Sequence, residues 1–506
     1  MSTKILSAAV VGLDAEIVEV EADLGGGDMG TFAIVGLPDT AVSESKERVK
    51  SAIRNSIGQM TRKKVTVNLA PADLKKHGPS YDLPIAVSVL IVANYLKASD
   101  AFKESLFVGE LALSGELRPV SGVLSIAFKA QKLGIKNLFV PKKNAKEAAL
   151  VKDIKVLPLE NLSQLVDHLE EKKKIQKTAK QEFNFARVSH SSDMCDIKGQ
   201  EHVKRAMEIV ASGAHNMLMN GPPGSGKTLI ARTLPSILPN LTLEEALEVT
   251  KIYSIAGHLP DNAALIDTRP YRSPHHTASG VALVGGGAWP RPGEISLAHR
   301  GVLFLDEFAE FPRSVLENLR QPLEDGVINV SRVAGNLNFP AKFILITAMN
   351  PCPCGFSSDE EKKCTCSPLQ IINYQKKISG PILDRIDLHV EVPRISFDKL
   401  SSDNRGEKSK DIKQRVEAVR ARQYERFRGE NIITNSEMSS EMIKRFCQVD
   451  NMSQRLLKNA VEQMHLSARA YFRILKLART IADLAEEENI ASTHIAEALQ
   501  YRERVL

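Results

Sequence analysis

The stretch Gly221-Pro-Pro-Gly-Ser-Gly-Lys-Thr228 decides how this 506-residue chain is interpreted. It matches the pattern G-x-x-x-x-G-K-T, and it stands between apolar runs at residues 217–219 and 229–231. This order predicts a strand, a phosphate-binding loop and a helix, because the loop's N–H groups and the start of the helix together surround phosphates. We therefore expect an ATP site built from Gly221, Pro222, Pro223, Gly224, Ser225, Gly226, Lys227 and Thr228.

Three downstream segments add acidic and polar groups to this site. An apolar strand at residues 301–305 ends in Asp306 and Glu307. We expect Lys227 to reach the β- and γ-phosphates, and Thr228 and Asp306 to bind Mg²⁺. Glu307 is placed to orient and polarise the attacking water. A second strand, residues 343–349, ends in Asn350, which we expect to contact the γ-phosphate or that water.

One arginine carries two interpretations. Arg385 lies between Asp384 and Asp387, just before a predicted strand at residues 388–392. It is either a structural arginine held in a salt bridge or an arginine finger that reaches the nucleotide of a neighbouring subunit.

Composition limits the class of protein. The net charge of +6 permits a nucleic-acid partner but does not demand one, and six cysteines in 506 residues exclude a secreted disulfide scaffold. The longest apolar stretch, residues 83–96, is about fourteen residues, whereas a membrane-spanning helix needs roughly 20. We expect a cytoplasmic protein with no membrane partner.

The pattern of residues divides the chain into parts. Residues 1–168 alternate short β-like runs, such as residues 32–35 and 137–140, with helix-like segments. A lysine-rich linker is predicted at residues 169–189, a second α/β domain at residues 190–400, and an all-helical lid at residues 401–506. The fold class is therefore a multidomain α/β protein with a helical carboxyl-terminal domain.

Four of the six cysteines crowd into fifteen residues: Cys352, Cys354, Cys364 and Cys366. Two C-x-C pairs on either side of a polar loop form a credible set of four thiolates for a structural Zn²⁺ ion. The alternatives are four free thiols or a redox pair.

The order of these motifs resembles AAA+ ATPases of the branch that contains Mg-chelatase ATPase subunits and MCM helicases. The segments Tyr271-Arg-Ser-Pro-His-His276, Val284-Gly-Gly-Gly287 and Pro292-Gly-Glu-Ile-Ser-Leu-Ala298 are closer still to the Mg-chelatase-like bacterial proteins of the YifB/ComM family. This resemblance spans essentially the whole chain.

The resemblance implies a ring, expected to be a hexamer, with Asn350 as sensor 1 and Arg385 as the finger that acts in trans. Residues 467–473 resemble the sensor 2 helix, with Arg469 as the first candidate for the nucleotide contact and Arg473 as the second. ComM-type members are understood as DNA helicases or translocases that promote branch migration in natural transformation. The expected partner is thus single-stranded or branched DNA, and the expected cofactors are ATP, Mg²⁺ and a structural Zn²⁺.

Residues 1–168 resemble the Lon-protease-like domain of this family, which has a ribosomal-S5-like fold. The segment that contains Ser80 lies where Lon proteases carry their nucleophile, but Leu124 stands where they carry the dyad lysine. Because a serine nucleophile needs such a base, we interpret the domain as a non-catalytic accessory part. An ATP-dependent Lon-like protease and a chelatase-type ATPase subunit remain the alternative functions.

Two further features bear on DNA binding. Residues 439–480 hold eight lysines and arginines against three acids, which predicts either a phosphate-contacting face or an ordinary solvated face. Trp289 lies in a glycine-rich segment where pore hairpins of the family are expected, although a structural role is at least as common for an isolated tryptophan.

Overall fold

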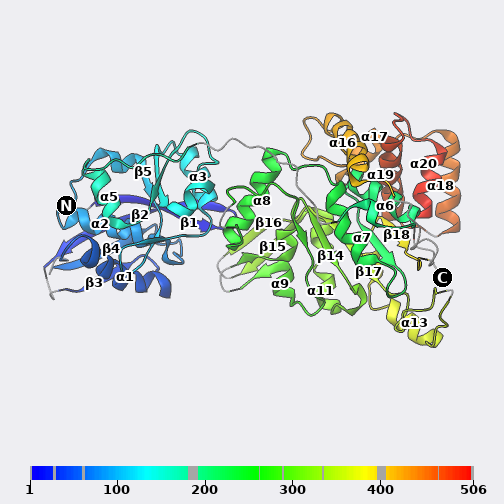
Figure 1. Ribbon diagram of the computed structural model, residues 1–506, viewed down its shortest axis with the longest axis horizontal. Helices are drawn as coiled ribbons and strands as arrows, with labels where there is room; N and C mark the ends of the chain where they lie inside the picture. Colours follow the sequence, from blue (N-terminus) through cyan, green and yellow to red (C-terminus); the bar gives the residue numbers. More distant parts are fainter. Residues whose placement is uncertain are drawn as a thin grey trace. The chain divides into compact units, whose positions relative to one another are not determined.

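The computed structural model describes residues 3–26, 30–59, 63–179, 192–260, 263–287, 290–332, 335–359, 361–395, 406–464 and 466–502. The chain divides into two compact units (Figure 1). The first unit contains residues 1–184 and 246–266, and the second contains residues 185–245 and 267–506. Trp289 and the second half of the predicted linker lie outside the described residues.

The first unit is built on a seven-stranded mixed sheet with the strand order β3-β4-β2-β1-β5-β8-β9. Its strands are β1 (Thr3–Val11), β2 (Asp14–Gly25), β3 (Phe32–Val35), β4 (Lys64–Ala70), β5 (Ser105–Phe107), β8 (Asn137–Pro141) and β9 (Lys155–Leu159), with a small hairpin of β6 (Glu110–Leu111) and β7 (Leu117–Arg118). The pairs β1-β2 and β2-β4 are antiparallel, and the other four are parallel. The predicted runs at residues 32–35 and 137–140 are therefore confirmed as strands.

Helices supply the rest of this unit: α1 (Thr40–Ser56), α2 (Asp82–Val92), α3 (Val123–Lys132), α4 (Ala145–Ala148) and α5 (Leu162–Leu169). The apolar stretch at residues 83–96 is mostly helix α2, which is buried on all sides from Asp82 to Ile91. That burial explains its mostly apolar composition, since a helix apolar around most of its circumference belongs in a core. In the described parts of the chain, every helix is too short or too polar to cross a bilayer.

Helix α8 (Leu243–Ala256) follows the P-loop segment in sequence, yet from Ala246 onward it belongs to the first unit. Leu247 packs against an apolar cluster of that unit that includes Leu124. The Ser254 carbonyl accepts a hydrogen bond from the Gly122 amide at 3.2 Å. The first unit therefore includes a piece of chain that sequence order places inside the ATPase segment.

The second unit contains a five-stranded, all-parallel sheet in the order β11-β14-β17-β10-β18. The strands are β11 (Tyr271–Arg272), β14 (Val302–Leu305), β17 (Ile344–Met349), β10 (Met217–Asn220) and β18 (Leu388–Glu391). β14 and β17 are buried at every residue, as expected of central strands covered on both faces. Two hairpins stand apart from this sheet, β12 (Gly285–Gly286) with β13 (Arg291–Pro292), and β15 (Val327–Arg332) with β16 (Gly335–Pro340).

Helices of two kinds complete the unit. Those interleaved with the strands are α6 (Glu201–Gly213), α7 (Lys227–Thr233), α9 (Gly280–Val284), α10 (Glu294–Leu297), α11 (Arg313–Glu317), α12 (Arg320–Asp325), α13 (Pro368–Gln375) and α14 (Gly380–Leu383). The carboxyl-terminal helices are α16 (Ser409–Arg426), α17 (Ser440–Phe446), α18 (Asn451–Gln463), α19 (Ala468–Leu484) and α20 (Ser492–Gln500). A helical carboxyl-terminal region is thus confirmed, and α16 and α19 pack against α6 of the sheet layer.

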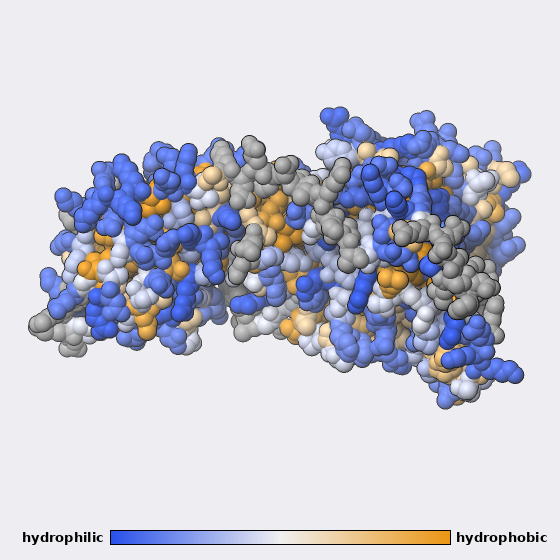
Figure 2. Space-filling model, in the orientation of Figure 1, coloured by the Kyte–Doolittle hydropathy of each residue, from blue (hydrophilic) through white to orange (hydrophobic). Residues whose placement is uncertain are grey.

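One continuous apolar core joins the sheet to these last helices. Ile346 and Val390 of the sheet belong to the same buried cluster as Ile474, Leu477 and Ile481 of α19. The helical spacing at residues 474, 477, 478 and 481, noted in the sequence, is the buried face of that helix. On the face of the molecule seen in Figure 2, hydrophilic residues predominate and hydrophobic ones form small scattered patches.

Candidate functional site

The P-loop connects strand β10 to helix α7 at the carboxyl edge of the sheet. Asn220 ends the strand and Lys227 begins the helix, as the sequence predicts. A Cβ atom on Gly221 would lie 2.2 Å from the Val392 carbonyl oxygen, so only glycine fits there. Gly226 has a φ of 89°, a left-handed conformation that glycine adopts without steric cost. These two positions explain why the loop needs glycine at both ends.

Lys227 bridges the loop and the neighbouring strand. Its ammonium group donates to the carbonyl oxygens of Gly221 at 2.6 Å and Pro222 at 2.8 Å, and to Asn350 Oδ1 at 3.3 Å. Burial lowers the pKa of Lys227 to about 8, and the nearby Asp306 carboxylate opposes that shift. The structure thus brings together Lys227 and Asn350, which are 123 positions apart in the sequence.

Thr228 and Asp306 form the pair expected to hold Mg²⁺. The Thr228 hydroxyl donates to Asp306 Oδ2 at 2.7 Å, and Asp306 directly follows the buried strand β14. A hydroxyl and a carboxylate oxygen are hard ligands of the kind Mg²⁺ prefers, and a P-loop Ser/Thr and a strand-terminal Asp are the usual protein ligands in P-loop enzymes. These donors fit the ion.

Glu307 occupies an unusual backbone position beside a histidine. Glu307 lies just after strand β14 with a φ of 51°, in the left-handed region, and its side chain is largely exposed. Glu307 Oε2 lies 3.0 Å from His276 Nδ1. His276 follows β11, which pairs in parallel with β14, so the two side chains come from adjacent strand ends.

Sequence analysis did not identify His276 as a site residue. The signal was available: a polar pair, His275-His276, follows a strand that ends at the same edge as β14. Without the strand order, however, the sequence does not reveal that this strand is the neighbour of β14. His276 is therefore a candidate site residue that the sheet topology, and not the sequence alone, brings beside Glu307.

The three candidate arginines lie at the opposite, amino edge of the sheet. Arg385 is 3% exposed, and its guanidinium lies 2.6 Å from Glu324 Oε1. Arg469 is 62% exposed at its side chain and lies 3.5 Å from the same oxygen. Arg473 donates to the Arg385 carbonyl at 2.8 Å and forms an ion pair with Asp387 at 2.5 Å. All three therefore cluster around two carboxylates.

Asp387 connects this cluster to the amino end of strand β10. It accepts a hydrogen bond at 3.0 Å from the amide of Asn216, the residue before strand β10. Burial would raise the pKa of Asp387, but Arg473 and His215 beside it hold that pKa well below its usual range. The four residues of β10 separate this cluster from the P-loop by about 13 Å at roughly 3.3 Å per residue. Within one chain, the structure does not bring the arginines to the phosphate site.

The four clustered cysteines come together as one group. All four sulfur atoms lie within 4.8 Å of one another. The Sγ distances are 3.4 Å from Cys352 to Cys354, 3.7 Å from Cys352 to Cys364 and 3.6 Å from Cys354 to Cys364. A tetrahedral zinc with bonds of about 2.3 Å requires sulfur separations of about 3.8 Å. Backbone N–H groups of Thr365 and Phe356 lower the pKa of Cys354 to about 5, which favours the thiolate that a metal binds. The donor set fits Zn²⁺.

This cysteine loop lies directly against the P-loop. A Cβ atom on Gly355 would lie 2.7 Å from Cδ of Pro223, so the two loops are in contact. The loop is also tied to the end of the sheet, because Arg394 lies 2.6 Å from Asp359 and over the ring of Phe356. The cysteine group is thus built into the support of the phosphate site.

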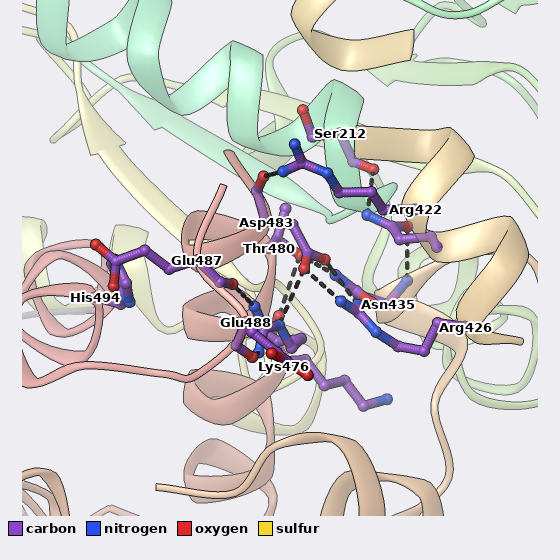
Figure 3. Close-up of polar contacts among 12 residues, drawn as sticks. Ser212, Arg422, Arg426, Asn435, Lys476, Thr480, Asp483, Glu487, Glu488 and His494 are labelled. Carbon is purple, nitrogen blue, oxygen red and sulfur yellow. Dashed lines mark hydrogen bonds and ion pairs between the residues drawn. The ribbon is translucent and has the colours of Figure 1, made fainter. Parts of the chain in front are cut away.

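The basic residues of the region 439–480 do not form one face. Arg479 is buried and donates to Asp483 at 3.1 Å, in a network that also includes Arg426 and Asn435 (Figure 3). Arg473 is occupied by Asp387, as described above. The exposed members are Lys444, Arg445, Arg455 and Lys458 on α17 and α18, and Arg469 on α19. Part of the local excess of charge therefore stabilises the fold.

In the first unit, the positions that the sequence compares with the Lon dyad are Ser80 and Leu124, and Leu124 and Asp82 near them make contacts within the fold. Leu124 is fully buried, and its amide donates to Glu147 at 2.9 Å. Asp82, two residues after Ser80, is buried and lies 2.7 Å from Arg48. Its carboxylate also accepts from the Leu111 amide at 3.1 Å. Neither Leu124 nor Asp82 offers a base to Ser80.

Three family models match successive parts of the chain. The model described as subunit ChlI of Mg-chelatase matches residues 20–144, the one described as magnesium chelatase, subunit ChlI matches residues 193–400, and its carboxyl-terminal counterpart matches residues 406–502.

Curated relatives match along the whole chain. The competence protein ComM of Haemophilus influenzae is 44% identical over 99% of this chain and 97% of its own. The uncharacterized protein YifB of Escherichia coli is 43% identical over 98% and 96%, respectively. The magnesium-chelatase 38 kDa subunit of Rhodobacter capsulatus is 27% identical over 31% of this chain and 49% of its own.

Proposed function

Because this chain belongs to the YifB/ComM family of Mg-chelatase-like AAA+ ATPases, we propose that it is a ring-shaped motor that uses ATP hydrolysis to move DNA. The ring is a hexamer, and its work is the branch migration of recombination intermediates. The observation that carries the proposal is the separation of the ATP-site residues onto opposite edges of one sheet.

The carboxyl edge binds the nucleotide and prepares the water. Lys227 exchanges its carbonyl partners, Gly221 and Pro222, for phosphate oxygens. Thr228 and Asp306 hold Mg²⁺, which neutralises charge that develops on the phosphates. Glu307 leaves His276 and accepts a proton from the attacking water, while Asn350 orients that water or the γ-phosphate.

The amino edge acts on the nucleotide of a neighbouring copy. Arg385, Arg469 and Arg473 are held by Glu324 and Asp387, about 13 Å along the sheet from their own P-loop. Heterologous interfaces close into head-to-tail rings, and in such a ring we place this edge against the P-loop of the next copy. Arg385 then serves as the arginine finger, and Arg469 or Arg473 serves as sensor 2.

The cysteine group holds a structural Zn²⁺ ion. Four thiolates leave no coordination position for water, so the ion has no catalytic part. Because Gly355 of the cysteine loop contacts Pro223, the ion stabilises the P-loop through this contact.

The relative named as a competence protein supports the choice of DNA as the substrate. Lys444, Arg445, Arg455 and Lys458 provide exposed cations on α17 and α18 that suit phosphate contacts. The first unit, which we assign to the Lon-like, ribosomal-S5-like fold, acts as an accessory part, because Leu124 replaces the lysine of a catalytic dyad.

Three assays separate this proposal from its alternatives. ATP hydrolysis is measured with and without single-stranded and four-way branched DNA, and strand exchange is followed on a labelled branched substrate. We expect DNA to stimulate hydrolysis and ATP to drive branch migration, with Glu307→Gln as the inactive control. Indifference to DNA would contradict the motor function and favour a chelatase-type subunit. ATP-dependent cleavage of unfolded casein would contradict the non-catalytic assignment of the first unit.

A further inference from the structure

A cavity of about 590 Å³ opens in the second unit, between the amino edge of the sheet and the carboxyl-terminal helices. Its walls come from segments that precede strands, such as residues 300–301 and 341–344, and from α16, residues 432–443 and α19. Seven arginines and lysines line it against five aspartates and glutamates. The cavity therefore has an excess of positive charge in a partly desolvated space.

Several of the lining cations have carboxylate partners. Arg269 lies 3.0 Å from Glu245, and Lys342 lies 2.6 Å from Glu437. At the end nearest Arg469, Asp387 neutralises Arg473. These pairs account for much of the charge, as expected for buried ions.

Arg420 and Lys476 are the exceptions. Arg420 donates through Nε at 3.1 Å and Nη2 at 2.9 Å to the Ala211 carbonyl. Lys476 donates to the Ser436 carbonyl at 2.8 Å. Among the described residues, no carboxylate lies within 4.0 Å of either cation; Glu245 and Glu437, which act on Arg420 from farther away, are already paired. Burial lowers the pKa of Lys476 to about 8 and that of Arg420 below its usual range.

A neighbouring cluster on the same helix shows the usual arrangement. Arg479, three residues after Lys476, is matched by Asp483 one turn further along α19. In Figure 3 the Lys476 side chain extends away from that network. The chain thus supplies a carboxylate to Arg479 but leaves the ammonium of Lys476 facing the cavity.

We propose that this cavity binds a small anion with at least two phosphoryl groups, which completes the partners of Arg420 and Lys476. Lysine and arginine are the ordinary ligands of phosphate oxygens, and a guanidinium offers them a planar fork. Apolar side chains share the walls, among them Met438, Ile443 and Phe472, and they suit a nucleoside attached to the phosphates. The cavity is distinct from the P-loop of the same chain, which lies at the opposite edge of the sheet, but it shares Arg469 and Arg473 with the cluster that we propose to act on a neighbour's nucleotide.

Such a ligand would connect the two layers of the unit. Arg420 and Lys476 belong to α16 and α19, whereas Lys342 precedes strand β17. A bound anion would tie the carboxyl-terminal helices to the base of the sheet. The cavity is therefore placed to influence how these helices sit on the ATPase sheet.

The test measures binding of inorganic pyrophosphate by calorimetry to the full chain that carries Lys227→Ala, which removes phosphate binding at the P-loop. We expect a Kd below about 1 mM and a loss of about tenfold on adding Lys476→Met, as for one charge-assisted hydrogen bond. Lys476→Arg retains the charge and is expected to bind within about twofold of the parent. Lys410→Met, the same change at an exposed lysine of α16, is the matched control and should bind like the parent.

A second variant is expected to strengthen pyrophosphate binding, whereas a folding defect would weaken it. Glu437→Gln removes the carboxylate beside Lys342 and should tighten pyrophosphate binding several-fold. ADP distinguishes the two sources of phosphate: tighter binding than pyrophosphate supports a nucleotide, and equal binding supports an inorganic polyphosphate. No binding of either probe, or equal binding by the Lys476→Met and Lys410→Met chains, would overturn the proposal. Because these chains cannot bind ATP at the P-loop, the result is independent of whether DNA stimulates hydrolysis.

Discussion

At the carboxyl edge of the five-stranded sheet, charged and polar side chains contact one another in three separate pairs: Lys227 with Asn350, Thr228 with Asp306, and Glu307 with His276. At the amino edge, Arg385 and Arg473 are held by Glu324 and Asp387 of their own chain, with Arg385 almost fully buried. The first edge has partners that a nucleotide and a metal can replace. The second edge has partners that hold arginines in place.

The difference indicates how one ATP site is divided. Nucleotide-binding groups must be reachable by a ligand that enters and leaves, so weak carbonyl and side-chain contacts suit them. A group that stabilises charge only in the transition state gains from being fixed beforehand. The ion pairs of Arg385 and Arg473 fix both guanidinium groups at the edge of the sheet opposite their own P-loop, and our proposal requires that a neighbouring copy uses them.

The largest expected effect comes from the amino edge. Arg385→Ala should lower the rate of ATP hydrolysis by about a thousandfold, the range of a lost arginine finger, while ATP binding stays unchanged. Steady-state hydrolysis and nucleotide binding measure the two quantities separately.

The control for this variant is Glu324→Gln, which removes the intrachain partner of Arg385 and leaves the arginine in place. If Arg385 is a finger that Glu324 preorganises, Glu324→Gln should lower hydrolysis much less than Arg385→Ala, because the guanidinium is still present. Equal losses of melting temperature and of activity in both variants would show that the Arg385–Glu324 pair is structural.

At the carboxyl edge, Glu307→Gln should lower hydrolysis by about a hundredfold to a thousandfold, because the amide cannot accept a proton from water. ATP binding should persist, in contrast to Lys227→Ala, which removes the phosphate contact. A Glu307→Gln chain that hydrolyses ATP at the normal rate would contradict the assignment of the base.

Removing the metal should have a smaller effect on the same edge. Cys364→Ser with Cys366→Ser should abolish zinc binding, lower the melting temperature and reduce hydrolysis about tenfold, since the cysteine loop supports Pro223. Elemental analysis of the wild-type chain checks the premise, and less than about a tenth of an equivalent of zinc would refute it. Cys195→Ser, at a cysteine outside the group, is the matched control.

The smallest effect is expected at His276. His276→Ala releases the Glu307 carboxylate from its 3.0 Å contact, and we expect basal hydrolysis to rise by about twofold to fivefold. The increase over this background that DNA produces should shrink accordingly. A fall in basal rate would instead mean that His276 holds Glu307 in its working position.

The sequence predicts most of the side chains that meet at the carboxyl edge of the sheet, but few of the contacts at the amino edge. The P-loop, Asp306, Glu307 and Asn350 each follow a strongly apolar strand, and parallel strands end at a common edge, so their meeting follows from local pattern. Glu324 lies on the short helix α12, Arg385 in the turn after α14 and Arg473 on α19. No periodicity in the sequence indicates which carboxylate each arginine meets. The membership of α8 in the first unit was equally hidden, because that helix looks like any other amphipathic segment.

The central claim is that one ATP site needs two chains, and mixing two inactive variants tests it directly. Arg385→Ala chains keep an intact P-loop edge, and Glu307→Gln chains keep an intact arginine edge. We predict that each variant alone is nearly inactive and that an equimolar mixture, assembled before ATP is added, recovers a clear fraction of wild-type hydrolysis. If the mixture remains as inactive as the separate variants while both chains assemble together, the division of the site between neighbouring copies is wrong.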